Sequence, residues 1–146
     1  MLVTLKEVLD LCEARECAVG SFNTPNLEAV IAVIKAAEEL NVPVIIQHAQ
    51  VHEELMPLKV IGPIMLEQAK KAKVPVVAHI DHGETLDYIY QALDMGFTSV
   101  MYDGSTLPFA ENAANTKLAA AMAKSKGASV EGEIGSMGRR ETGEKT

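Results

Sequence analysis

Hydrophobic residues follow two alternating spacings along this chain. Short apolar runs, typical of strands that are buried on both faces, lie at residues 18–22, 43–47, 74–79, 98–102 and 128–134. Before and between them, apolar residues recur at helical spacing, which predicts helices over residues 4–14, 24–41, 54–72, 86–96 and 108–126. The pattern therefore predicts one helix followed by strands and helices in strict alternation.

Local signals place several of the predicted helix ends. Thr4 and Glu7 have the spacing of a capping box, which predicts the start of the first helix. Thr24 followed by Pro25 predicts an N-cap with proline at the first helical position of the second helix. The Gly-Pro pair at residues 62–63 predicts a bend within the third helix.

Strict alternation with apolar strands predicts an α/β protein with a parallel sheet, either an open doubly wound sheet or part of a (β/α)8 TIM barrel. No Gly-x-Gly-x-x-Gly follows the first strand, which weakens the dinucleotide-binding form of the open sheet. Polar residues at the end of every strand instead favour the barrel, and they are Asn23, Gln47, His48, Asp81, His82, Asp103 and Glu133. Because a barrel needs about 250 residues and eight strands, we expect this chain to supply an N-terminal helix and about the first five strands.

Composition narrows the function classes. With 48% hydrophobic residues among 146, the chain is expected to bury a core as one domain. A net charge of −7 without a basic patch argues against nucleic-acid binding, and no apolar run is long enough for a membrane span. Cys12 and Cys17 lack metal-ligand spacing and are expected to be reduced thiols in a cytoplasmic protein, since no secretory signal is visible.

The apolar run at residues 74–79 leads directly into the motif His79-Ile80-Asp81-His82. Ionisable residues at the carboxyl end of a buried strand are typical of an α/β enzyme's substrate site. A single histidine in this place is more often a hydrogen-bonded structural residue, whereas the whole motif favours a site. Asp81 and His82 would point to opposite faces of a regular strand, so both can serve one site only if the strand has already turned, which Gly83 permits.

Four motifs carry a resemblance to a known family: Gly20-Ser21-Phe22-Asn23 followed by Asn26-Leu27-Glu28, then His79-Ile80-Asp81-His82, Tyr102-Asp103-Gly104-Ser105 and residues 130–135 (Val-Glu-Gly-Glu-Ile-Gly). Together they resemble the class II, metal-dependent ketose-bisphosphate aldolases of the fructose- and tagatose-bisphosphate type. The resemblance implies that residues 1–146 are the N-terminal portion of a single aldolase TIM-barrel domain. It also implies a zinc enzyme that reversibly cleaves a ketose phosphate or bisphosphate to dihydroxyacetone phosphate and an aldehyde through a metal-stabilised enediolate.

The resemblance assigns roles to individual residues. Asp81 matches the catalytic carboxylate that takes the C4 hydroxyl proton during cleavage, and His82 matches the first of three zinc-binding histidines. Asp103 and Glu133 match carboxylates near the metal, which in some members hold a second cation position. Glu141 falls where the family has a mobile-loop glutamate that exchanges a proton with the enediolate carbon.

Substrate contacts are expected from Asn23, Gln47 and His48 at the ends of the first two strands. Ala49 stands where fructose-bisphosphate enzymes commonly carry a phosphate-contacting serine, and residues 139–140 (Arg-Arg) replace the usual glycine and glutamate. These differences leave a neighbouring ketose phosphate open as the substrate.

The chemistry itself favours a metal. Cleavage next to a ketone leaves an electron pair that a divalent ion can stabilise, and a carboxylate adjacent to a ligand can reach the departing proton. The Schiff-base alternative needs a lysine at a strand end, and Lys35, Lys59, Lys117 and Lys124 all fall on predicted helices.

Two other hypotheses stay open: a catalytically incomplete half-barrel fragment, and a sugar-phosphate-binding protein or isomerase on a similar barrel. The expected partners are a sugar phosphate, the C-terminal half of the barrel with the two other zinc-binding histidines, and a further copy in a dimer or tetramer.

Overall fold

A computed structural model of the chain describes residues 1–135, and these form one five-stranded sheet in the order β1-β2-β3-β4-β5. Its strands are β1 (Gly20–Asn23), β2 (Val44–Ala49), β3 (Val76–Gly83), β4 (Ser99–Tyr102) and β5 (Ser129–Gly132). Its α-helices are α1 (Leu5–Ala14), α2 (Leu27–Leu40), α3 (Leu58–Lys71), α4 (Leu86–Met95) and α5 (Phe109–Ser125). A single 3-10 turn, η1 (Gln50–His52), follows β2.

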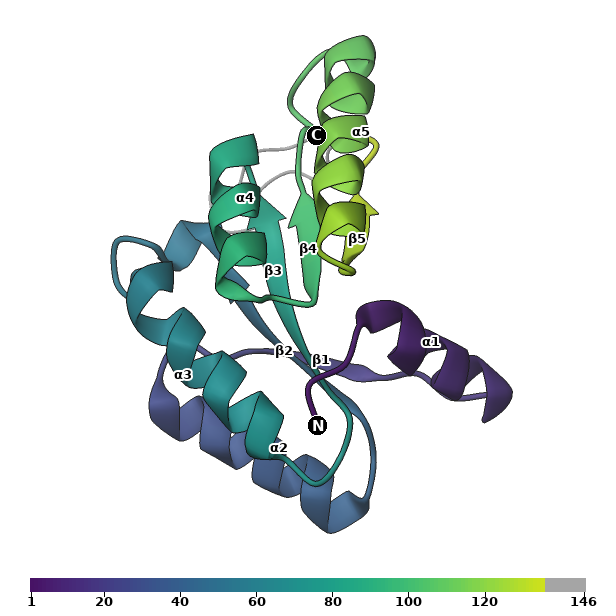
Figure 1. Ribbon diagram of the computed structural model, residues 1–146, viewed down its shortest axis with the longest axis vertical. Coiled ribbons are helices and arrows are strands. Elements are labelled where there is room, and N and C mark those ends of the chain that lie inside the picture. The colour runs from purple at the N-terminus through teal and green to yellow at the C-terminus, as the bar shows by residue number, and fades with distance from the viewer. Residues whose placement is uncertain (136–146) are drawn as a thin grey trace.

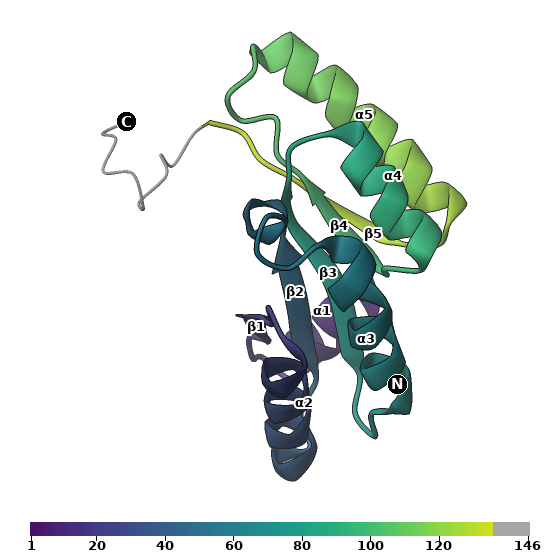
Figure 2. The ribbon, with the colours of Figure 1, turned by 90° about the vertical axis from the view of Figure 1, so that its left-hand side faces the viewer.

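Every neighbouring pair of strands is parallel, so all the carboxyl ends lie along one edge of the sheet. Helices α2 to α5 cover one face, called here the outer face, while α1 lies on the opposite, inner face (Figures 1 and 2). The prediction of an α/β half-barrel with an N-terminal helix and five strands is confirmed.

The main hydrophobic core lies between the outer face and the helices. Val76, Ala78 and Ile80 of β3 are all fully buried there, as is Ile46 of β2. Each large aliphatic side chain buried in this way stabilises the fold by about 1.5–3 kcal/mol relative to exposure. Because successive side chains point to opposite faces of the sheet, every second residue of this part of β2 and β3 packs in the outer core.

The inner face has a smaller apolar layer at its amino-terminal end only. There Val8 and Cys12 of α1 pack on Ile45 and Val77. The chain just before α1 is tied to the start of β3, where Leu2 forms a parallel bridge with Val76. Because α1 covers the amino ends of the strands, the polar residues toward their carboxyl ends stay uncovered by it.

The second helix begins differently from the prediction. Asn26, not Thr24, is the N-cap of α2, and its side-chain oxygen accepts the N–H of Ala29 at 2.8 Å. Thr24 is instead fully buried, and its N–H donates to the carbonyl of Gln47 at 3.0 Å. Asparagine and threonine are both good caps, so the contact with β2 decides between them.

The third helix begins at Leu58 rather than at residue 54. The chain after β2 forms η1 first, and Pro57 then takes an extended conformation as the N-cap. A carboxylate from outside the helix, that of Glu53, accepts the Leu58 N–H at 2.9 Å. The helix is thus capped by an acidic side chain five residues earlier in the chain, outside the spacing of a capping box.

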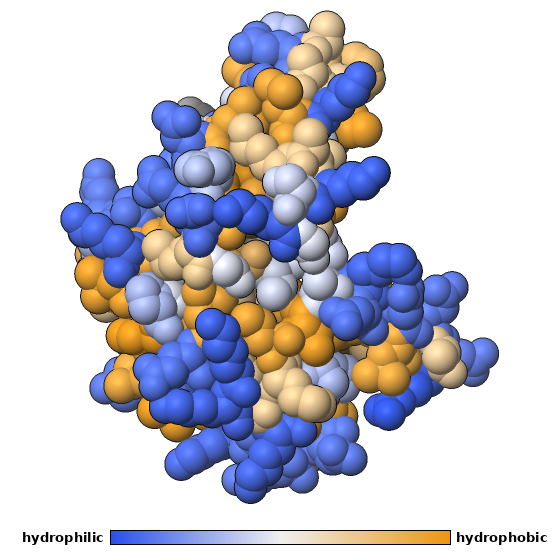
Figure 3. Space-filling model, in the orientation of Figure 1, coloured by the Kyte–Doolittle hydropathy of each residue, from blue (hydrophilic) through white to orange (hydrophobic). Residues whose placement is uncertain are grey.

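Burial differs between the middle and the edges of the sheet. All four residues of β4 are buried, whereas all four residues of β1 are exposed, as are three of the four in β5. Hydrophobic residues also reach the surface in several places among hydrophilic ones (Figure 3). Within residues 1–135, no helix combines the length and apolar composition needed to cross a membrane.

Candidate active site

The carboxyl end of β3 turns so that Asp81 and His82 serve the same side of the sheet. His79 and Asp81 point to the inner face by alternation, and the pairing of β3 with β4 slips between Ile80 and Gly83. His82 itself has the left-handed backbone conformation, with φ of 47°. This turn places His82 Nε2 3.8 Å from Asp81 Oδ1. The expected turn is present, but it is made at His82 and not at Gly83.

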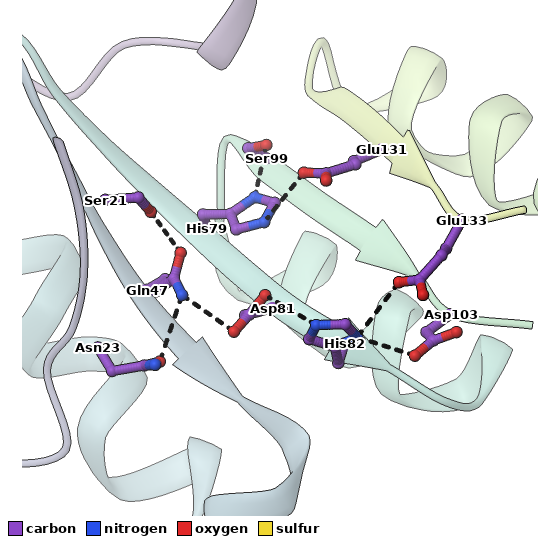
Figure 4. Close-up of polar contacts among 10 residues, drawn as sticks. All are labelled: Ser21, Asn23, Gln47, His79, Asp81, His82, Ser99, Asp103, Glu131 and Glu133. Atoms are coloured by element: carbon purple, nitrogen blue, oxygen red, sulfur yellow. Dashed lines mark hydrogen bonds and ion pairs between the residues drawn. The ribbon is translucent and has the colours of Figure 1, made fainter. Parts of the chain in front are cut away.

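His82, Asp103 and Glu133 form a cluster at the ends of β3, β4 and β5 (Figure 4). His82 Nδ1 lies 2.8 Å from Asp103 Oδ2 and 3.7 Å from Glu133 Oε2. One potential ligand atom from each of the three lies within 4.8 Å of the others. The three residues expected to surround the metal are therefore brought together from strands that are far apart in the sequence.

His82 and Asp103 each stabilise the charged form of the other. Burial acts to lower the pKa of His82, but the hydrogen bond with Asp103 and the charges of Asp81, Asp103 and Glu133 outweigh it and raise the pKa. Burial acts to raise the pKa of Asp103, while hydrogen bonds from Ser105 and His82 more than compensate and lower it. The site is thus acidic and attracts cations.

The donor set fits a divalent cation. An imidazole nitrogen and two carboxylates are ligands that zinc and similar ions accept, and a catalytic zinc has three protein ligands and an open position. His82 is half exposed, with Asp103 and Glu133 less exposed, so the cluster is open to solvent on one side.

Asp81 is held by a chain of amide and hydroxyl groups from β1 and β2. Gln47 Nε2 donates to Asp81 Oδ2 at 2.9 Å and approaches Asn23 Oδ1 at 3.5 Å. Ser21 Oγ is hydrogen-bonded to Gln47 Oε1 on the other side of the amide (Figure 4). Burial raises the pKa of Asp81, which suits a group that must accept and return a proton.

Sequence reasoning gave Glu131 no role, although it is a polar neighbour of the site. Glu131 Oε2 lies 3.6 Å from His79 Nε2, and His79 Nδ1 lies 2.8 Å from Ser99 Oγ. Burial, together with the charges of Asp81 and Glu133, raises the pKa of Glu131. Burial lowers the pKa of His79 to about 4, so this imidazole is neutral at physiological pH. The sequence feature that could have indicated Glu131 is its position two residues before Glu133, because such residues point to the same face of a strand.

The structure does not bring His48 to this site. In register it pairs with Ile80, whose side chain lies in the outer core, and its own side chain is fully buried. His48 Nε2 is 3.9 Å from Glu53, the residue that also accepts the Tyr88 hydroxyl at 2.9 Å. The structure therefore does not support the expected substrate contact of His48, since alternation turns its side chain away from Gln47 and Asp81.

Asn23 and Gln47 do lie on the inner face, paired in register at the ends of β1 and β2. Glu141, the remaining expected catalytic residue, lies outside the described residues.

The fold and the cluster define half of an α/β barrel with an ionisable site at the carboxyl ends of its strands, the arrangement typical of barrel enzymes. The sequence matches the family described as fructose-bisphosphate aldolase class-II over residues 3–146. The chain belongs to this family of aldolases.

Individual relatives agree with the family. The chain is 40% identical over 147 residues to the 6-phospho-5-dehydro-2-deoxy-D-gluconate aldolase of Halalkalibacterium halodurans, covering 97% of this chain and 50% of that protein. It is 39% identical over 140 residues to the fructose-bisphosphate aldolase of Giardia intestinalis, covering 94% and 43%. The crystal structure of the YdjI aldolase from Escherichia coli matches with a TM-score of 0.87 and 34% identity, covering 92% of this chain and 53% of that one. The chain spans about half the length of these relatives.

Proposed function

We propose that this chain forms the N-terminal half of a zinc-dependent aldolase that reversibly cleaves a ketose phosphate to dihydroxyacetone phosphate and an aldehyde. The observation that carries the proposal is the juxtaposition of Asp81 with His82, at 3.8 Å, beside the carboxylates of Asp103 and Glu133. A proton acceptor next to a cation site is what carbon–carbon cleavage beside a ketone requires.

In this proposal each residue has a separate task. His82, Asp103 and Glu133 would hold the cation, which when bound supplies charge stabilisation to the electron-rich carbon fragment. Asp81 takes the proton of the C4 hydroxyl during cleavage and returns it during condensation. Asn23, at the end of β1, contacts the substrate, and Glu141 exchanges the proton at the carbon of the three-carbon product.

The names of the relatives support a phosphorylated sugar substrate without choosing one, because the Halalkalibacterium and Giardia proteins are named for different sugars. Two features support a partner for the open edges of the sheet. All of β1 is exposed, and Ile134, just beyond β5, is 82% exposed. Unpaired strand edges and exposed apolar residues favour association, so we propose that the second half of the barrel covers them.

An assay of the complete enzyme with a panel of ketose phosphates tests the function. We expect cleavage that is lost on treatment with a chelator and restored by zinc, and that is insensitive to borohydride in the presence of substrate, because no imine forms. Inactivation by borohydride, or full activity after complete metal removal, would contradict the metal mechanism. Absence of cleavage of every ketose phosphate would favour the binding-protein or isomerase hypothesis.

Zinc titration of this chain alone tests how much of the metal site it contains. A single imidazole with two carboxylates is expected to bind zinc weakly, since tight tetrahedral sites use more nitrogen or sulfur ligands. Calorimetry is expected to give an affinity at least about a hundredfold weaker than for the complete enzyme. A His82→Asn variant serves as the control and should abolish the remaining binding.

A further inference from the structure

We infer that Gln47 is a positioning residue for Asp81, and that the hydroxyl of Ser21 anchors the amide group that does so. This inference rests on the proposed function, because it assigns Gln47 a task in the proton transfer of Asp81. It replaces the expected role of Gln47 as a substrate contact.

Gln47 lies centrally on the inner face, between the strand that carries Asn23 and the strand that carries the catalytic carboxylate. It pairs in register with Asn23 on one side and with His79 on the other. From this place its Nε2 reaches Asp81 Oδ2 at 2.9 Å, two residues beyond its register partner. The contact therefore crosses from β2 to β3 diagonally, toward the carboxyl edge where the site lies (Figure 4).

The hydrogen bonds allow one orientation of the amide. An ionised Asp81 can only accept, so the Gln47 group that faces it must be the Nε2 donor. Gln47 Oε1 then faces Ser21, whose hydroxyl donates to it. A flipped amide would set Oε1 against the carboxylate of Asp81, bringing two acceptors together. The acceptors Asp81 and Asn23 thus select the orientation of the amide, and the Ser21 hydroxyl, which can donate or accept, anchors the amide oxygen in it.

Gln47 has little capacity left for a substrate. Its two N–H donors are directed to Asp81 and Asn23, and its carbonyl oxygen accepts from Ser21. A side chain whose donors are used within the protein is suited to holding a neighbour rather than a ligand. For this reason we expect its loss to affect the chemical step more than substrate binding.

The hydrogen bond from Gln47 gives the two carboxylate oxygens of Asp81 different surroundings. Oδ2 accepts the amide N–H, while Oδ1 faces the cation site at 3.8 Å from His82 Nε2. The carboxylate plane is fixed by the bond at Oδ2, so Oδ1 is presented to the hydroxyl whose proton it takes. Orientation of a reacting group in this way contributes to rate without touching substrate.

The test compares Gln47→Leu, Ser21→Ala and Asp81→Ala with the double variant Gln47→Leu/Asp81→Ala in the complete enzyme. Gln47→Leu is expected to lower kcat by about 10- to 100-fold, the usual cost of losing an outer partner of a functional group, with KM changed less than about twofold. Ser21→Ala is expected to lower kcat by a smaller factor of about 3 to 10, because the amide is kept but loses its anchor.

The double variant separates positioning from a merely structural role. If Gln47 acts through Asp81, the double variant is no slower than Asp81→Ala alone, since the two losses are not additive. Gln91→Leu, at an exposed glutamine of α4, is the matched control and should leave kcat and KM unchanged. Zinc content should be the same in all variants, and crystals of Ser21→Ala should show the Gln47 amide or the Asp81 carboxylate rotated.

Three outcomes would overturn the inference. They are a raised KM with unchanged kcat in Gln47→Leu, a loss in the double variant equal to the product of the single losses, and an unchanged Asp81 orientation and kcat in Ser21→Ala. Each of these presupposes a wild-type enzyme that cleaves ketose phosphates. A wild type without cleavage instead refutes the proposed function, so the two failures are distinguishable.

Discussion

Toward its carboxyl end, β3 carries apolar residues on its outer face and ionisable residues on its inner face. On the outer face, Val76, Ala78 and Ile80 are fully buried among helix side chains. On the inner face, His79 contacts Ser99 and Glu131, and Asp81 contacts Gln47 and His82. One strand can thus contribute to stability on one face and to a polar site on the other, because alternation keeps the two sets of side chains apart.

The largest effect expected from breaking this separation is on activity. Asp81→Ala removes the proposed proton carrier and is expected to lower cleavage by about 10²–10⁴-fold while zinc stays bound. Its effect on the free energy of unfolding should be small, because the carboxylate lies at the polar end of the inner face. Cleavage rates and metal analysis check both expectations. A variant that loses its metal would make Asp81 a ligand instead.

Substitution of Ile80, the residue before Asp81, should lower stability and leave activity unchanged. Ile80→Ala leaves a cavity in the outer core and is expected to lower the free energy of unfolding by about 2–5 kcal/mol. The kcat per folded molecule should not change, because the side chain faces away from Asp81. Urea unfolding and active-site titration measure the two quantities. Val60→Ala, at a half-exposed position of α3, is the control and should cost less than about 1 kcal/mol.

The smallest expected effect is the pH dependence of the free energy of unfolding that His79, on the inner face, contributes. The pKa of His79 is lowered to about 4 by burial, against an ordinary value of 6.5. The unfolded chain therefore binds a proton that the folded chain does not, and stability falls as the pH drops from 6.5 toward 4. The expected loss approaches roughly 3 kcal/mol at the acid end of this window.

His79→Asn isolates this contribution, because asparagine can keep a hydrogen bond to Ser99 but does not titrate. Asp81 and Glu131 have raised pKa values, so their effect on stability has the opposite sign and is common to both proteins. The difference between the unfolding free energies of wild type and variant, measured from pH 7 to pH 4, should therefore shrink with acidity. A constant difference would show that folding does not shift the pKa of His79.

The succession of elements could be predicted from the sequence, because buried parallel strands and amphipathic helices have different hydrophobic periods. Helix starts were less predictable where a contact other than a capping motif decides them. Thr24 had the sequence of a cap but hydrogen-bonds to β2, and Leu58 is capped by Glu53. The Thr24 contact depends on the tertiary fold, and the Glu53 contact depends on the η1 turn between β2 and α3, so neither follows from a local capping motif.

The site was predicted in part for a similar reason. The motifs identified His82, Asp103 and Glu133, and the parallel sheet brings them together. The orientation of His48 was not predictable, because the run at residues 44–46 (Val-Ile-Ile) is apolar on both faces and does not say which face is inner. Glu131 was missed because its partner, His79, is fixed only by strand pairing.

The backbone of His82 limits which residues evolution or a designer can place there. Left-handed conformations are tolerated by glycine and, among other residues, by asparagine, aspartate and histidine, while most others cost about 1–3 kcal/mol. Of the tolerated types, only histidine and aspartate bind zinc well. Cysteine and glutamate, which are good ligands elsewhere, would meet a backbone that resists them. A saturation library at position 82 should therefore be filtered twice, by conformation and by coordination, and aspartate is the one substitution expected to pass both filters.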